Sequence, residues 1–471
     1  MINKISSKLK ELFGIDLRTL ALFRICLAVI IIIDLLQRLR DLDAFYVDNG
    51  VFPRTVLINN YSNLYNFSFH LSNGSYGIQL IFFIVALIFA FCLLIGFQTK
   101  IATLLSWIFM VSLHVRMPFI LIGGDELLRM ILFWSIFLPL GARFSLDGIL
   151  NPPKEKLPEK MFSAASVTLL SQILILYWFS VVFKSRTPEW QDGSAIYYAL
   201  CQDHYLTRFG KILFQHPDIM KTLTHASFWF EMIGPVLLFM PFFTSIFRVI
   251  IISAFIVFQS TMGLCIELTL FPWVSSIAML PYLPIPKTFS HFSQEPAGTN
   301  INSSRFINIL VSFLFIYVLW WNLGTINERF KIPERLQWIG YSLRLDQKWS
   351  LYCPLASVSY WYVIPAKLRD GTEVDLFQDG KKVSWKKPDY ATYSYKNRHW
   401  RGYMLHLAWF EYSRNLLFPH YCAYLYRKWN EKHPYAKQIK EIQIFLMYKR
   451  QLKDYKTEEP EKVYLWKYVY P

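Results

Sequence analysis

The chain has 471 residues, of which 54% are hydrophobic, 18% are aromatic and only 17% are charged. Soluble domains carry about 25% charged residues, so this composition excludes an ordinary soluble protein and predicts an integral membrane protein. Much of the net charge of +16 lies in loops and in the C-terminal tail, where a membrane surface is a better counterion than nucleic acid. We therefore expect the lipid bilayer, and no nucleic acid, as a partner.

Long uncharged apolar runs predict an α-helical multi-pass membrane protein with about nine spans, because roughly 20 residues cross a bilayer as a helix. The fourth run is short and the eighth contains three prolines, so these two fit the pattern least well. The first run lacks a small-residue cleavage site, so no cleavable signal peptide is expected. The runs cover residues 20–39, 78–97, 101–122, 127–140, 161–183, 222–243, 246–266, 268–285 and 306–325.

Basic residues near the first span and in the 143–160 loop predict a cytoplasmic N-terminus. Nine spans then place the C-terminal part outside the cell. The bias is modest, since the loop after the fifth run is also basic.

The first run contains Arg24 and Asp34, and a charge at the centre of a span costs on the order of 3 kcal/mol. Ten helical residues separate the two side chains by roughly 80 degrees and about 15 Å along the axis, so they cannot pair with each other. We expect each to face a polar bundle interior shared with Asp125 and Glu231. His114 and Arg116, shortly before the stretch GGDELLR at 123–129, are expected to snorkel.

Asp125 lies in the stretch GGDELLR, where it can pair with Arg129 at the i,i+4 spacing. A capped helix start whose acidic residues offset the helix dipole explains the stretch equally well. Glu231 has no basic neighbour within one turn, so it is either protonated or paired with another helix. Gln259 is more typical of a hydrogen bond between helices than of chemistry.

The segment FKSRTPEWQDG places Lys184 at the end of the fifth run, followed by Trp190 and Gly193. A lysine in a water-poor pocket loses its proton more readily and can serve as a base. The alternative is that Lys184 and Arg186 mark the end of a span, with Trp190 as an interfacial anchor.

The last 146 residues, 326–471, contain no further span and predict a small α+β extramembrane domain after a membrane domain at 1–325. Asp370-Gly371 and Asp379-Gly380 favour tight hairpin turns, and strands are expected at 441–449 and 462–470 with a helix around 421–432. The six cysteines form no metal or redox motif. Their spacing leaves open a disulfide between two of Cys201, Cys353 and Cys422.

Several of these segments together resemble the HTTM family, the membrane module shared by vitamin K-dependent gamma-glutamyl carboxylases and many bacterial proteins. The resemblance covers about residues 18–285. It rests on ALFRICLA with Asp34, on SLDGIL at 145–150, on FKSRTPEWQDGSAIYYAL, on Glu231 before a Gly-containing run, and on FQSTMGLCIELTLFPW. The tail resembles the extension of bacterial members, which implies a bacterial cytoplasmic membrane as the location.

The resemblance implies a carboxylase-like or epoxidase-like enzyme, a lyase or an oxidoreductase, with a reduced quinone such as a vitamin K hydroquinone as cofactor. Lys184 would be the catalytic base with Glu231 and Asp125 as further catalytic residues, and no metal. Arg24, Asp34, Trp190 and Gln259 would bind the substrate. The chain departs from the family in the spacing of Lys184 and Trp190, in GGDE and Gln259 where histidines are expected, and in lacking the peptide-binding lumenal domain.

Three functions follow as hypotheses. The first is a membrane enzyme acting at the outer leaflet on a quinone-like or lipidic substrate, or on a peptide. The second is a maturation or export factor for a secreted peptide. The third is a proton-coupled transporter whose buried acids relay protons.

Overall fold

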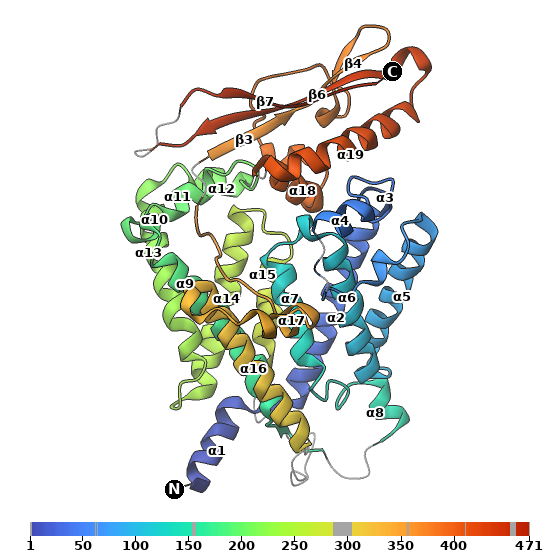
Figure 1. Ribbon diagram of the computed structural model, residues 1–471. Helices are drawn as coiled ribbons and strands as arrows, with labels where there is room; N and C mark the ends of the chain where they lie inside the picture. The colour runs from blue at the N-terminus through green and yellow to red at the C-terminus, as the bar shows by residue number, and fades with distance from the viewer. Residues whose placement is uncertain are drawn as a thin grey trace.

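The computed structural model of the chain describes residues 2–470 except 62, 64, 153–156, 286–303, 356–357, 410 and 453–457. The described part is mostly helical, and a β-sheet region lies near the C-terminus. The sheet sits on one end of a bundle of helices (Figure 1). This arrangement agrees with the helical class and the C-terminal strands that the sequence predicts.

Five of the predicted runs form helices that are long and apolar enough to cross a membrane. Their lengths of 20 to 23 residues correspond to roughly 30 to 35 Å of helix, which matches the hydrocarbon core of a bilayer. They are α2 (Leu17–Leu39), α5 (Tyr76–Ile95), α9 (Ala164–Lys184), α14 (Thr244–Cys265) and α16 (Arg305–Ile326).

The other four runs are also helical but are shorter or less apolar. They form α6 (Thr99–Arg116), α7 (Gly123–Ser135), α13 (Pro217–Leu237) and α15 (Phe271–Met279). With 13 and 9 residues, α7 and α15 reach only about 20 and 14 Å, less than the thickness of the hydrocarbon core. The count of nine spans therefore stays a prediction.

The outer surface of the bundle is apolar, as α5 shows clearly. Ile81, Ile84, Ile88 and Phe91 lie on one face of this helix, and each exposes 46 to 55% of its surface. A continuous apolar face of this kind is unusual on a soluble protein and fits contact with lipid chains.

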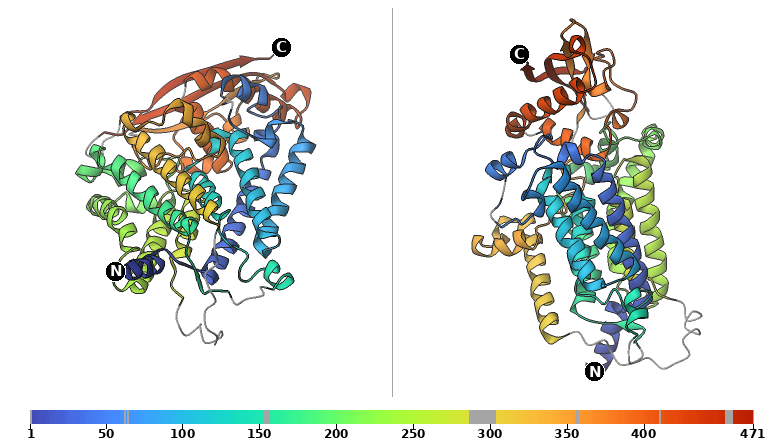
Figure 2. Two further views of the ribbon diagram at one scale, coloured as in Figure 1. Left: turned by 60° about the horizontal axis from the view of Figure 1, so that its bottom comes forward. Right: turned by 90° about the vertical axis from the view of Figure 1, so that its right-hand side faces the viewer.

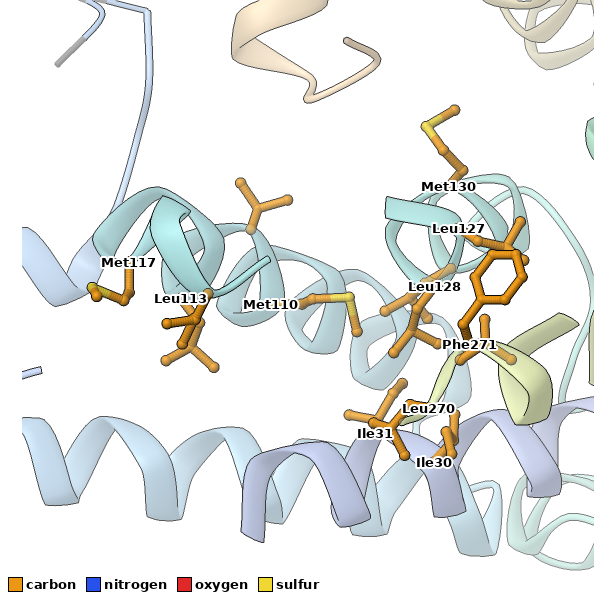
Figure 3. Close-up of a cluster of buried hydrophobic side chains, with 14 of the residues drawn as sticks. Ile30, Ile31, Met110, Leu113, Met117, Leu127, Leu128, Met130, Leu270 and Phe271 are labelled. Carbon is orange, nitrogen blue, oxygen red and sulfur yellow. The ribbon is translucent and has the colours of Figure 1, made fainter. Parts of the chain in front are cut away.

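The short helix α7 lies inside the bundle, and the short helix α15 packs against it. Figure 3 shows apolar side chains of α2, α6 and α7 meeting Leu270 and Phe271 at the start of α15. Almost every residue of α7 from Gly124 onward is buried, so this helix is surrounded by protein on all sides. The polar residues at its first turn must therefore find partners within the protein.

The C-terminal region forms an antiparallel sheet with two helices beneath it. The long strand β6 pairs with β7 along one edge and with β3 and β4 along the other, and β4 also pairs with β5. Helices α18 and α19 lie between the sheet and the bundle (Figure 1). The elements are β3 (Val358–Val363), β4 (Pro365–Leu368), β5 (Glu373–Asp375), α18 (Arg398–Trp409), α19 (Glu411–Asn430), β6 (Ile439–Arg450) and β7 (Glu461–Val469).

The local predictions for this region are confirmed where the structure tests them. Asp370 and Gly371 form the turn between β4 and β5, and the φ of +87° at Gly371 is the left-handed conformation that glycine adopts without strain. The expected strands and helix correspond to β6, β7 and α19. All six cysteines are free thiols, so the disulfide left open by the sequence does not form.

After α16 the chain returns to the bundle before it reaches the sheet. Helix α17 (Glu334–Ser342) lies against the bundle (Figure 1), and Trp349 beyond it is fully buried. Gln347 accepts hydrogen bonds from Gln172 on α9, at 2.9 Å, and from Trp349, at 2.6 Å. The sequence suggested a domain boundary after Thr325 because the composition becomes more polar there. Some side chains beyond this boundary nevertheless have their partners inside the bundle.

The N-terminal helix α1 (Ile2–Phe13) and the C-terminal domain lie at opposite ends of the bundle. All three views in Figures 1 and 2 show this separation. The placement fits the predicted topology, in which these two parts face opposite sides of the membrane.

Candidate functional site

Lys184 and Glu231 form an ion pair between two helices. Lys184 is the last residue of α9 and Glu231 lies in the fourth turn of α13, and the lysine Nζ donates a hydrogen bond to Glu231 Oε2. Both residues are buried, with 1% and 5% of their surfaces exposed. Of the two states expected for Glu231, the structure shows the one in which it is paired with another helix.

Trp190 covers this pair. The Lys184 Nζ lies 4.3 Å from the centroid of the Trp190 ring, which is a cation–π distance. Trp190 is buried and donates its indole N–H to the carbonyl of Tyr352 at 3.3 Å. The lysine is therefore enclosed by a carboxylate and an aromatic face, and it is not a snorkelling residue at a lipid surface.

Polar side chains without hydrogen-bond partners lie around the pair. Tyr177 on α9 accepts a hydrogen bond of 2.8 Å from Gln259 on α14, which makes Gln259 the helix-to-helix contact that the sequence suggested. Among the described residues, Gln259 Oε1, Ser180 Oγ and the Tyr352 hydroxyl have no hydrogen-bond partner. Buried polar atoms are rarely left unpaired, so they mark a place where water or a ligand belongs.

A pocket of about 280 Å³ adjoins this cluster. Tyr352 and Cys353 form part of its wall, and the hydrogen bond from Trp190 to Tyr352 connects that wall to the pair, although Lys184 and Glu231 do not themselves line the pocket. Ile122, Ile266 and Phe271 contribute an apolar side. This size is close to the lower end of the range for small-molecule sites, which is about 300 to 1,000 Å³.

A second group of buried charges lies where the C-terminal domain meets the bundle. Arg38 on α2 donates to Asp34 at 2.7 Å, to Asp125 at 2.5 Å and to the Tyr46 hydroxyl at 3.2 Å. Arg398 on α18 forms a further ion pair with Asp34. We call Asp34, Arg38, Asp125 and Arg398 the four-charge network; it joins α2, α7 and α18.

The structure corrects the predicted pairing of Asp125. Asp125 bonds to Arg38 and also accepts the backbone N–H of Ile122 at 2.9 Å, as an acidic residue in the first turn of a helix does. Arg129 instead turns to Asp346, whose carbonyl accepts its hydrogen bond. The alternative, a helix start capped by its acidic residue, is therefore confirmed. The pairing with Arg129 is wrong because the segment that carries Asp346 returns into the bundle, which local spacing cannot show.

His114 and Arg116 are also corrected, because neither snorkels. Both are buried, and the His114 Nε2 lies 4.0 Å from Asp125 Oδ1. Arg116 donates to the carbonyl of Phe52 at 2.9 Å. Two carbonyls of the loop 46–53, those of Val47 and Phe52, hold Arg116 at the end of α6.

Arg24 lies apart from all other candidate residues. It donates to the backbone carbonyls of Leu140, at 3.3 Å, and Phe144, at 2.5 Å. The expectation of one cavity shared by Arg24, Asp34, Asp125 and Glu231 is therefore wrong. Asp34 and Asp125 meet, Glu231 pairs with Lys184, and Arg24 holds the loop that precedes α8 (Leu146–Leu150).

Sequence reasoning missed Arg38 and Arg398, the two cations of the four-charge network. Arg38 follows Asp34 at the i,i+4 spacing, so the helical pattern contains a signal for that pair. Arg398 lies more than 350 residues from Asp34 in the chain, and no local pattern reveals that contact. Tyr352 and Cys353 were missed for the same reason.

Histidines at the junction of the two regions are kept neutral. Burial lowers the pKa of His399 well below its ordinary value, and the nearby guanidinium of Arg398 acts in the same direction. Burial also lowers the pKa of His204 to about 3, with a smaller effect from Arg401. The junction therefore favours uncharged imidazoles.

Comparisons with protein-family models, with curated proteins and with solved structures found no match to this chain.

Proposed function

We propose that this chain is an integral membrane enzyme of the HTTM type in which Lys184 exchanges a proton with a quinone-like or lipidic substrate. The observation that carries the proposal is the buried Lys184–Glu231 pair under Trp190, beside a pocket and next to unpaired polar atoms. A buried acid and base in direct contact, close to a pocket, are candidates for a catalytic site. The five long apolar helices and the apolar outer face of α5 support the membrane location.

The Lys184–Glu231 pair can transfer a proton in two balanced steps. When the ammonium of Lys184 passes its proton to the carboxylate of Glu231, both groups become neutral, which a dry environment favours. The free amine can then take the proton of an acidic hydroxyl such as that of a hydroquinone. The O–H bond breaks, an N–H bond forms, and the electron pair remains on the quinol oxygen next to the ammonium.

A reduced quinone is the cofactor or substrate class that this proposal implies, and its ring would occupy the pocket beside Tyr352. Asp125 is not part of the proposed proton transfer, because its oxygens are engaged by Arg38 and by the N-terminus of α7. Gln259 and Trp190 would position the pair and the substrate. Carboxylation of glutamate is not included in the proposal.

The decisive experiment uses the purified full-length protein with reduced naphthoquinones and benzoquinones, and follows oxygen consumption and the products by mass spectrometry. We expect turnover by the native protein and its loss in Lys184→Ala and Glu231→Gln. Lys221→Ala, an exposed lysine on α13, is the matched control and should keep full activity.

Lys184→Arg separates a base from an anion anchor, because arginine keeps the charge but does not deprotonate. Loss of activity in this variant supports a base. Full activity of Lys184→Ala with any active substrate would contradict the proposal. A requirement for a membrane potential would favour the transporter, and a requirement for a secreted peptide would favour the maturation factor.

A further inference from the structure

A groove of about 870 Å³ lies between the bundle and the C-terminal domain. One wall comes from α2 and α15, and the upper rim comes from the start of α18 and the residues just before it. We call it the α2–α15 groove. It is separate from the Lys184–Glu231 pair, since neither of those residues lines it.

The lower part of the groove is apolar and opens to the side of the bundle. Val29 and Ile33 on α2 expose 41% and 38% of their surfaces, and Trp273 on α15 exposes 66%. These are the same outward faces that would contact lipid chains. An acyl chain could therefore enter from the side without crossing a polar barrier.

The upper rim is basic. Arg40, Lys396, Arg398 and Arg401 line it, against the single carboxylate of Glu267. Arg398 is paired with Asp34 behind the wall, and the carboxylate of Asp41 accepts a hydrogen bond from Asn397 at the rim. One positive charge therefore remains after the carboxylates of Glu267, Asp34 and Asp41 are counted. Among the described residues, neither Arg40 nor Lys396 forms an ion pair, and both are exposed.

Buried polar atoms at the rim lack partners. His399 exposes only 1% of its surface and lines the groove, yet its Nε2 has no hydrogen-bond partner among the described residues. The Nε of Arg398 is unpaired in the same way. Such atoms are costly to leave without partners and indicate a ligand with hydrogen-bonding oxygens at this place.

We propose that the α2–α15 groove binds an anionic phospholipid, with its phosphate against Arg40, Lys396 and His399 and one acyl chain along α2 and α15. Phosphate satisfies several donors at once and carries the charge that the rim lacks. This site goes beyond the proposed function, because it would hold lipid whether or not Lys184 is catalytic.

The length of the groove fits this occupant. Its lining on α2 runs from Arg40, at the end of the helix, to Cys26. Fourteen residues of helix correspond to roughly 21 Å. Half of a bilayer's hydrocarbon core is about 15 Å thick, so the groove extends from the headgroup level to near the bilayer centre. A free anion would leave this apolar length empty.

The test is native mass spectrometry of the full-length protein, with phosphatidylglycerol and phosphatidylcholine of identical acyl chains as probes. We expect phosphatidylglycerol to bind at least tenfold more tightly. Arg40→Ala/Lys396→Ala should lower its affinity about tenfold or more, because a hydrogen bond to a charged group contributes about 1.5 to 3 kcal/mol, and 1.4 kcal/mol is tenfold. Lys381→Ala/Lys386→Ala removes two exposed lysines of the same domain outside the groove and should change nothing.

A second pair of variants tests the acyl chain. Val29→Trp fills the groove and should weaken phosphatidylglycerol binding, whereas Leu36→Trp, at an exposed position of α2 outside the groove, should not. Equal binding of the two lipids, or unchanged binding in the rim variant, would overturn the proposal. Competition by glycerol phosphate at equal concentration would show a free-anion site and would overturn it as well.

Discussion

The chain buries charge in two places, and the two places are built differently. The four-charge network contains two acids and two arginines, and it joins α2 and α7 to α18 of the C-terminal domain. The Lys184–Glu231 pair contains one of each and joins only α9 and α13. Both are electrically balanced when ionised, so net charge does not distinguish them.

The difference lies in how completely the surroundings engage the charged atoms. Three donor nitrogens of Arg38 are hydrogen-bonded, and Asp125 also caps a helix, so proton transfer would break several contacts. Lys184 has three donor hydrogens but, among the described residues, one hydrogen-bond acceptor, Glu231, with an aromatic face beside it. A fully engaged network stabilises a fold, whereas a sparsely engaged pair near a pocket can exchange its proton.

The first prediction removes the centre of the network. Arg38→Met leaves Asp34 and Asp125 buried with one cation fewer, and breaking a buried ion pair costs about 3 to 5 kcal/mol. We expect a loss of stability at the upper end of this range, because Asp34 and Asp125 both lose their hydrogen bonds from Arg38. The measurement is the thermal midpoint of the purified full-length protein.

Arg335→Met is the control for this variant, since Arg335 on α17 is exposed and lies outside the α2–α15 groove. It should unfold like the native protein. If Arg38→Met were as stable as Arg335→Met, the network would not be structural and the contrast between the two charge clusters would fail.

The sequence predicted the type of most elements because helical length, apolarity and turn dipeptides are local properties. Asp370-Gly371 forms the predicted turn and the apolar runs are helical. In both cases a few neighbouring residues determine the local structure. It also predicted correctly that Arg24 and Asp34 do not pair, since helix geometry alone sets their separation.

What the sequence could not supply was the set of partners far away in the chain. Arg398 reaches Asp34 and Asp346 reaches Arg129 only because the C-terminal part folds back on the bundle. The charged residues of the apolar runs are buried, as the sequence suggested, but their grouping differs from the predicted one. Pairing across helices depends on packing, which periodicity does not encode.

The second prediction concerns the sparsely engaged pair. Lys184→Met alone should cost about 3 kcal/mol, because the Glu231 carboxylate is left buried without a cation. The double variant Lys184→Met/Glu231→Leu should recover to within about 1 kcal/mol of the native protein, since well-packed apolar residues often replace a buried ion pair without loss. Thermal midpoints and enzymatic activity are measured together.

Activity should stay absent in the double variant although its stability is restored. This outcome separates a functional pair from a structural one. A double variant that is no more stable than Lys184→Met, with no recovery at all, would mean that the pair holds α9 and α13 together.

The third prediction uses acid to open the junction of the two regions. His204 is fully enclosed and stacks on Tyr360 of β3 at 4.8 Å between ring centroids. Burial lowers its pKa from 6.5 to about 3, so the folded state disfavours the charged imidazole. Stability is complete above pH 6.5 and is lost as the pH falls from 6.5 towards 3; at pH 5 the loss is about 2 kcal/mol.

His204→Phe keeps a ring on Tyr360 but cannot take up a proton. The thermal midpoint of the native protein should fall between pH 7.5 and pH 5, and this fall should be smaller in the variant. An identical fall in both proteins would assign the acid sensitivity to other groups, such as His399.

The smallest effect on stability is expected for an ion pair at the surface of the C-terminal domain. Like the pair of Lys184 and Glu231, it joins a lysine to a carboxylate, but it is not buried. Lys437 lies 2.7 Å from Asp370, and the two side chains are 47% and 28% exposed. The pKa of the Asp370 carboxyl is lowered by its hydrogen bonds with Lys437 and Thr372, yet water and salt screen such a pair. Lys437→Ala should therefore leave the thermal midpoint unchanged within error, in low and in high salt. A clear drop that disappears in high salt would show that exposure does not weaken this pair, and burial would then no longer explain the larger effects predicted for Arg38 and Lys184.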